Sequence, residues 1–108
     1  MKPDTSEALD LAVVHDQRSA ILTVNGRITI DSSPVFRARL LVILHERVPS
    51  LTVDLTKVPY VDTSGLATLV ETLKHARAAG TRLKLMLHER PRYLMEFTGL
   101  LPLFDNAD

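Results

Sequence analysis

Apolar and polar residues alternate with a period of two in four short stretches of the chain. This alternation predicts β-strands, because successive side chains of a strand point to opposite faces of a sheet. The four stretches are 8–13, 21–25, 51–55 and 82–87. A polar segment, 15–19, separates the first two and predicts a tight turn between the strands of an antiparallel hairpin. The polar residues 1–7 are expected to be disordered.

A period near 3.6 residues takes over in three longer stretches and predicts helices. These stretches are 34–46, 66–79 and 92–98. Ser33 before Pro34 is typical of a helix start, since a serine caps the first turn and proline has no N–H to leave unpaired there. Gly80 and Gly99 follow the second and third helices as C-terminal caps.

The three predicted helices differ in how much of their surface is apolar. In the second, four leucine and valine residues at helical spacing face the core, and the outer side carries Thr68, Glu71 and His75. The first has Phe36, Leu40, Ile43 and Leu44 on one face and adds Val35 and Val42 on others. It is therefore either buried on more than one side or in contact with a partner. In the third helix, Tyr93, Leu94 and Phe97 are expected to pack.

Two segments contain proline outside the predicted helices. The segment 56–59, which ends in Pro59, is expected to be a loop that leads from the third strand to the second helix. The apolar tail 100–104 is expected to return as a short edge strand or coil, because Pro102 has no N–H to donate within an inner strand.

The order β-β-α-β-α-β-α predicts an α/β fold with a small mixed sheet of four to five strands and helices packed on it. The hairpin strands are antiparallel, and the strands joined by helices are parallel. A chain of 108 residues supports one hydrophobic core, so residues 8–108 are expected to form a single domain.

Composition excludes several classes of function. Lys+Arg and Asp+Glu number 13 each, so the formal net charge is +0 and gives no general attraction to nucleic acid or to an anionic membrane. The chain has no cysteine, which excludes disulfides and thiolate metal sites, and its four histidines match no metal-ligand spacing. No apolar run approaches the ~20 residues that span a bilayer. A cytoplasmic protein without membrane insertion is the expectation.

No motif for catalysis is present. The four glycines are isolated, so the chain has neither a dinucleotide-binding glycine pattern nor a phosphate-binding loop. Asp54 and Asp62 both lie near the end of the third strand and could form an acid pair. A structural role is favoured for each, with Asp62 holding the turn and the start of the second helix. We therefore expect no catalytic residues, no cofactor and no metal.

The turn from Tyr60 to Leu66 is the most distinctive stretch of the sequence. It places hydroxyl groups between an apolar strand and a helix, at the strand end where open α/β sheets keep their functional groups. Asp, Thr and Ser before a helix are also ordinary caps, so composition alone favours a structural interpretation.

The motif Asp62-Thr63-Ser64-Gly65-Leu66, after a strand that ends in Leu55 and an aromatic residue at Tyr60, resembles the signature of the STAS-domain family. This family includes the bacterial anti-sigma factor antagonists. The similarity extends over nearly the whole chain, because the isolated glycines before the first helix, after the second helix and near the end lie where that family has such features.

The resemblance implies a non-enzymatic anti-sigma factor antagonist, which binds an anti-sigma factor kinase and thereby releases a sigma factor. The kinase inactivates the antagonist by phosphorylating the hydroxyl residue directly after the motif aspartate, and a phosphatase restores it. In this sequence that residue is Thr63, with Ser64 as the second candidate. The implied partner-binding residues are Thr29, Asp31, Tyr60, Asp62, Thr63, Ser64 and Gly65.

The sequence departs from the family pattern in two places, and the first departure keeps a rival function open. Many antagonists have an aspartate where this chain has Thr29, and the nearest acid here is Asp31. This departure favours an accessory subunit of an ABC-type lipid or solute transporter. The family's final helix is expected to be very short or absent, which would leave Leu101, Leu103 and Phe104 less covered. The apolar first helix also allows a homodimer, and a small hydrolase using Ser64 or Asp62 is a third function.

Overall fold

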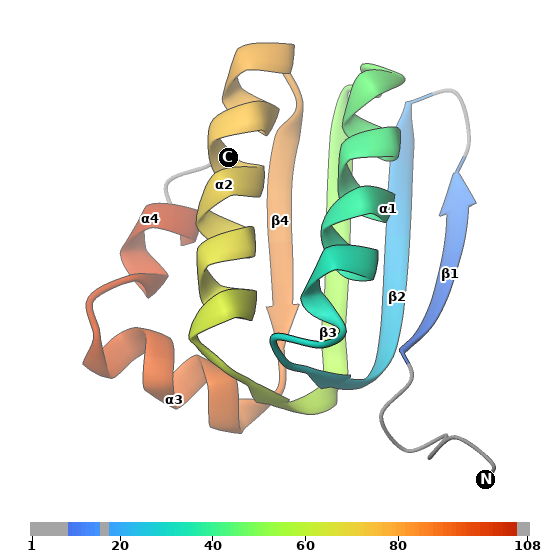
Figure 1. The fold of residues 1–108 in the computed structure, drawn as a ribbon. Helices are drawn as coiled ribbons and strands as arrows, with labels where there is room; N and C mark the ends of the chain where they lie inside the picture. The colour runs from blue at the N-terminus through green and yellow to red at the C-terminus, as the bar shows by residue number, and fades with distance from the viewer. Residues whose placement is uncertain (1–8, 16–17, 106–108) are drawn as a thin grey trace, which may run out of the picture.

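The computed structural model describes residues 9–15 and 18–105, which form four strands and four helices (Figure 1). In chain order these elements are β1 Asp10–His15, β2 Ser19–Ile28, α1 Ser33–His45, β3 Ser50–Val61, α2 Thr63–Ala79, β4 Arg82–Leu87, α3 Glu89–Phe97 and α4 Leu101–Asp105. The predicted disordered segment 1–7 and the middle of the predicted hairpin turn lie outside the described residues.

The described strands form one mixed sheet in the order β1-β2-β3-β4. β1 pairs with β2 in antiparallel register, whereas β2 with β3 and β3 with β4 are parallel. This arrangement confirms the predicted α/β class, the hairpin and the parallel strands, with four strands in the sheet. Because β2, β3 and β4 are parallel, their carboxyl ends lie at the same end of the sheet. The segments that follow these three strands therefore all lie at one end of the molecule (Figure 1).

One face of the sheet is covered and the other is open. Helices α1 and α2 lie over the first face, where alternate residues of β2 and β3 such as Leu22, Val24, Leu51 and Val53 are buried (Figure 1). The intervening residues of all four strands are partly or fully exposed. We call this second side the open face. The alternation of apolar and polar residues in the strands therefore reflects a sheet that is buried on one side only.

Helix α1 shows why its sequence carries surplus apolar residues. Phe36 and Leu40 are buried in the core, whereas Val35 and Val42 are 56% and 59% exposed on the opposite side. The second apolar face is thus at the surface. The predicted serine cap is wrong, because the helix begins at Ser33 and no side chain caps its first turn.

Strand β3 is longer than the sequence predicts. The segment 56–59, expected to be a loop, continues the strand and pairs with β2 as far as Val61. The pairing with β4 stops at Leu55, so from Thr56 onwards β3 is paired on one side only. Two register shifts against β2 accompany this extension. A strand paired on one side and carrying bulges tolerates Pro59, which explains why proline did not end it.

The C-terminal helices correct three further predictions, which concern the packing of α3, the form of the tail, and the expected exposure of Leu101 and Phe104. Helix α3 buries Pro91 and Met95, while Tyr93, Leu94 and Phe97, expected to pack, are 70%, 38% and 81% exposed. The tail expected to be an edge strand or coil is the short helix α4, which buries Leu101 and Phe104 and leaves Leu103 exposed. Proline is compatible with a first helical turn, so Pro102 does not exclude this helix.

Candidate functional site

Asp62 forms the junction between β3 and α2. Its backbone is extended, and its Oδ1 accepts hydrogen bonds from the backbone N–H groups of Ser64 at 2.9 Å and Gly65 at 3.1 Å. These are two of the N–H groups that a helix start leaves without an internal partner. Asp62 is therefore the N-cap of α2, as the sequence predicted, and the helix begins at Thr63 instead of Leu66.

The second carboxylate oxygen of Asp62 binds a different part of the chain. Oδ2 accepts a hydrogen bond from the backbone N–H of Ile30 at 2.9 Å, and the Asp62 N–H donates to the carbonyl of Ile28 at 3.0 Å. Partial burial would raise the pKa of Asp62, but the hydrogen bonds from Ser64, Gly65 and Ile30 outweigh it and hold the pKa below its usual value. The site thus carries a fixed negative charge that joins the turn to the loop after β2.

The loop between β2 and α1 contains the two predicted site residues Thr29 and Asp31. The Thr29 carbonyl accepts from the N–H groups of Ser32 and Ser33, and its Oγ1 accepts from the Asp31 N–H at 3.2 Å. Ser32 does not cap α1, because its hydroxyl donates to the carbonyl of Arg27. Ile30, which no sequence motif singles out, is 72% exposed in this loop. Its apolar side chain at a polar turn is the only signal that could have identified it.

The two hydroxyl residues of the motif have different surroundings. Thr63 is exposed at the first position of α2, and its side chain forms no hydrogen bond within the part of the chain that the structure describes. Ser64 is half-buried, and its hydroxyl donates to Asp62 Oδ1. Thr63 therefore presents a hydroxyl to solvent, whereas that of Ser64 is part of the cap.

Gly65 is required by a close approach of α2 to the sheet. A Cβ atom at this position would lie 2.6 Å from Cγ1 of Val61 and 2.7 Å from Cγ2 of Ile28. Both neighbours are buried, β-branched side chains with little freedom to move. The glycine of the motif thus brings the helix start against the ends of β2 and β3, which fixes where Thr63 lies.

Tyr60 belongs to a neighbouring surface, not to the turn itself. Its neighbour Val61 is buried beneath the helices, so Tyr60 points to the open face, where it is 45% exposed. The guanidinium carbon of Arg27 lies 4.7 Å from the centroid of its ring, an arrangement typical of a cation–π contact. The residues that follow the carboxyl ends of β2 and β3 therefore lie together, and Tyr60 lies on the adjoining open face. The first group consists of Thr29, Asp31, Asp62, Thr63, Ser64 and Gly65.

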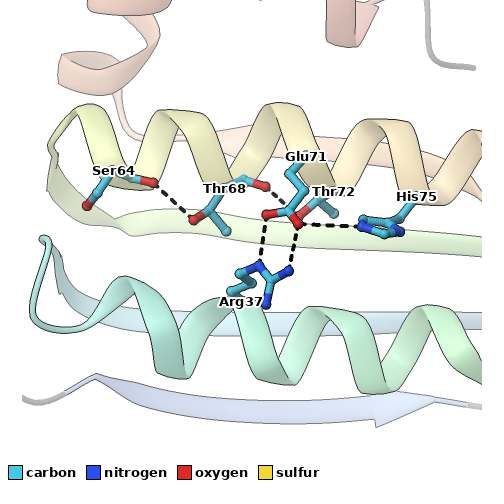
Figure 2. A network of polar contacts seen from close by, with 6 residues as sticks. All are labelled: Arg37, Ser64, Thr68, Glu71, Thr72 and His75. Atoms are coloured by element: carbon cyan, nitrogen blue, oxygen red, sulfur yellow. Dashed lines mark hydrogen bonds and ion pairs between the residues drawn. The ribbon is translucent and has the colours of Figure 1, made fainter.

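A chain of polar contacts runs along α2 from the site (Figure 2). The hydroxyl of Thr68 donates to the Ser64 carbonyl at 3.0 Å, and that of Thr72 donates to the Thr68 carbonyl at 2.7 Å. Thr68 is only 6% exposed, so its predicted place on the outer side of the helix is wrong.

An ion pair joins α2 to α1 along the same line (Figure 2). Arg37 of α1 donates two hydrogen bonds of 2.8 and 2.7 Å to the carboxylate of Glu71, and His75 lies 3.5 Å from the same carboxylate. The hydrogen bonds from Arg37 lower the pKa of Glu71 to about 2. The helix that carries Thr63 is thereby joined to α1 near its middle.

Asp54 and Asp62 do not form the acid pair that their positions in the sequence allow. Asp54 accepts hydrogen bonds from the hydroxyl and N–H of Thr56, which lower its pKa, and it shares no hydrogen bond with Asp62. Within residues 9–15 and 18–105, no group of three potential metal ligands comes together. No helix in these same ranges is long and apolar enough to cross a bilayer.

Comparison with protein families decides the classification of the chain. Residues 10–108 match the model of the STAS domain. The chain belongs to the STAS domain family. Among curated proteins, the anti-sigma-B factor antagonist of Bacillus subtilis (strain 168) is 34% identical over 98 residues, which cover 90% of this chain and 89% of that protein.

Solved structures of anti-sigma factor antagonists share this fold. An anti-sigma factor antagonist from Mycobacterium paratuberculosis has a TM-score of 0.78 at 20% identity and covers 94% of this chain and 92% of its own. The antagonist SpoIIAA in its unphosphorylated form has a TM-score of 0.71 at 17% identity, over 86% and 84% of the two chains. SpoIIAA has also been solved in a phosphorylated form, which is similar with a TM-score of 0.64 at 16% identity, over 86% of each chain.

Proposed function

We propose that this STAS protein is an anti-sigma factor antagonist, which binds an anti-sigma factor kinase and is released from it by phosphorylation at Thr63. The observation that carries this proposal is the solvent-exposed Thr63 hydroxyl at a helix start that is already capped by Asp62. The 34% identity to the anti-sigma-B factor antagonist supports the partner class. The proposal includes a phosphatase that reverses the modification and a cytoplasmic location.

The cap explains why a phosphate at Thr63 would stay on the surface. A helix start normally attracts anions through its free N–H groups and its partial positive charge. Here the Asp62 carboxylate already occupies the N–H groups of Ser64 and Gly65. A phosphoryl group would add about −1.5 to −2 charges beside this carboxylate. The N–H groups of Ser64 and Gly65 would not be free to donate hydrogen bonds to it.

An added dianion therefore acts on the interface more than on the fold. Within a complex the phosphate would have to lose its water, and an unpaired desolvated charge costs several kcal/mol. Each ~1.4 kcal/mol corresponds to a tenfold loss of affinity. We infer that phosphorylation excludes the partner locally and leaves the backbone of α2 where it is. The exposed Ile30 and the nearby Asp31 extend the proposed contact surface across the β2–α1 loop.

The proposal is tested by incubating the protein with ATP and each anti-sigma factor kinase of its own genome, and by mapping the phosphate with mass spectrometry. Thr63→Ala is expected to bind the kinase and to resist phosphorylation. Thr63→Glu is expected to bind at least about tenfold more weakly, with an unchanged circular dichroism spectrum. Ala78→Glu is the matched control, because it places the same charge on the exposed side of α2 near its other end.

Three results would contradict the proposal at different points. Phosphate on Ser64 would move the switch to the hydroxyl that now donates to Asp62. No modification by any of these kinases, together with co-purification with a permease, would replace the antagonist with a transporter subunit, the function that Thr29 favours. Equal loss of binding in Thr63→Glu and Ala78→Glu would show that the effect of charge is not local.

A further inference from the structure

The two edges of the sheet are protected to very different extents. β4 forms one edge, and both α3 and α4 contact it. β1 forms the other edge, and Figure 1 shows no described element beyond it. An uncovered edge strand presents a row of backbone N–H and C=O groups that can pair with another strand.

β1 also lacks the sequence features that usually prevent such pairing. Proteins blunt an exposed edge with a bulge, a proline, a lysine or an inward-pointing charge. The register of β1 on β2 is unbroken from Asp10 to His15, and the strand contains neither proline nor lysine. Four consecutive apolar residues, Leu11–Val14, occupy its centre. The edge is therefore regular and apolar, with charged or titratable residues only at its ends.

We propose that β1 pairs in antiparallel register with β1 of a second copy of this chain, so that two sheets join into one. A two-fold axis perpendicular to the sheet keeps each face continuous, so every residue lies opposite a residue of the same face. The registers that pair most of the strand are centred on Ala12 or on Val13. In either register most of the apolar centre of the strand, Leu11–Val14, pairs with the same segment of the second copy.

The side chains select the register centred on Val13. In that register Ala12 lies opposite the second copy's Val14 on the open face, and Leu11 lies opposite the second copy's His15 on the covered face. The register centred on Ala12 would instead place Asp10 opposite Val14. Val14 is 71% exposed and lies beside Ile21, which is 44% exposed, so the selected pairing extends an apolar row across the junction. Apolar cross-strand pairs stabilise a sheet, and a charge opposite valine does not.

The continuity of the two faces favours the antiparallel orientation, because a two-fold axis that made the strands parallel would put the open face of one copy beside the covered face of the other. Asp10 begins the strand and His15 ends it. Asp10 points to the open face and His15 to the covered face, so these two side chains do not pair across the junction. Asp10 is exposed, and His15 lies 3.9 Å from Glu46 of its own chain. β2 separates β1 from β3 and from the Asp62–Ser64 turn that follows β3, so this inference does not rest on the proposed function.

Sedimentation velocity over about 1–200 µM protein is expected to show reversible association, since a dimer is governed by mass action. Val14→Lys adds a charge to each copy at the junction and is expected to raise the dimer dissociation constant at least about tenfold. Val42→Lys is the matched control, because Val42 is similarly exposed on α1 and is expected to leave association unchanged. A monomer throughout this range, or a larger effect of Val42→Lys, would overturn the proposal.

A second experiment uses the absence of cysteine from the chain. Ala12→Cys and Val14→Cys are made separately, mixed and oxidised under mild conditions. Mixed disulfide dimers are expected to form faster than Val14→Cys dimers, because opposite residues have Cβ atoms about 4.5–5.5 Å apart and diagonal residues about 7–8 Å. Faster self-linking of Ala12→Cys would overturn the selected register. Rates no higher than for Ala12→Cys mixed with Val42→Cys would overturn the pairing itself.

Discussion

Asp62 Oδ2 lies 2.9 Å from the backbone N of Ile30, so one side chain joins the turn after β3 to the loop after β2. The other oxygen of the same carboxylate caps α2. One charged group therefore both caps the helix and joins the two loops of the candidate site. Removing parts of that group separates its two roles.

Asp62→Asn is expected to retain the cap and to lose the connection to Ile30, because an amide has one accepting oxygen and an NH2 group that cannot accept from an N–H. Asp62→Ala removes both contacts. Loss of a helix cap costs about 0.5–2 kcal/mol, and loss of a charged hydrogen bond adds about 1 kcal/mol or more. Urea unfolding should rank the variants as wild type, Asn, then Ala. Equal stability of Asn and wild type would show that the Ile30 contact contributes nothing.

Gly65→Ala is expected to destabilise the protein by about 1–3 kcal/mol, although alanine is the better helix former. The reason is the lack of space for a Cβ between Val61 and Ile28. Adding Val61→Ala removes the nearer of the two contacting atoms, so the cost of Gly65→Ala should be smaller in that background. A double-mutant cycle from urea unfolding measures this coupling. Additive effects would mean that the helix moves to accommodate the methyl group.

The sequence predicts the order of strands and helices as far as α3, the parallel strands and the capping role of Asp62, because each depends on local periodicity or turn chemistry. It failed where tertiary pairing overrides a local signal. Pro59 is typical of a loop, yet β3 is paired on one side only at that point and accepts it. Thr68 is polar, which predicts an outer position, yet its hydroxyl bonds within its own helix and the residue is buried.

The contact between the two loops could not be predicted from the sequence for a related reason. Asp62 and Ile30 are 32 positions apart, and their hydrogen bond depends on the parallel pairing of β2 with β3. Neither residue carries a local signal for it. Similarly, the exposure of Tyr93 and Phe97 depends on how a short helix is oriented after β4, which the apolar character of these residues does not reveal.

Arg47→Gly is expected to stabilise the protein by about 0.5–1 kcal/mol. Arg47 is the one non-glycine residue with a positive φ among the described residues, at 56°, where it follows the C-terminus of α1. Glycine adopts this left-handed conformation without the steric penalty that a Cβ brings, though part of the gain is offset by its entropy in the unfolded chain. Glu46→Gly is the control, since Glu46 has a φ of −74° and should lose stability. Thermal melts of both variants measure the difference.

Glu71→Gln is expected to lower stability slightly at neutral pH, with an effect that fades in acid. The folded pKa of Glu71 is lowered from 4.5 to about 2 by Arg37, and the imidazole of His75 lies beside the same carboxylate. A lowered folded pKa contributes stability that is present above the unfolded value and is lost as the pH falls through the folded value. The ion pair is 48% and 38% exposed, so solvent screens it and the effect should be small. Urea midpoints of wild type and Glu71→Gln should therefore differ by a constant amount from neutral pH to about 5 and converge between about 4.5 and 2. A difference that persists unchanged into acid would show that Glu71 stabilises the helix pair through packing and not through its charge.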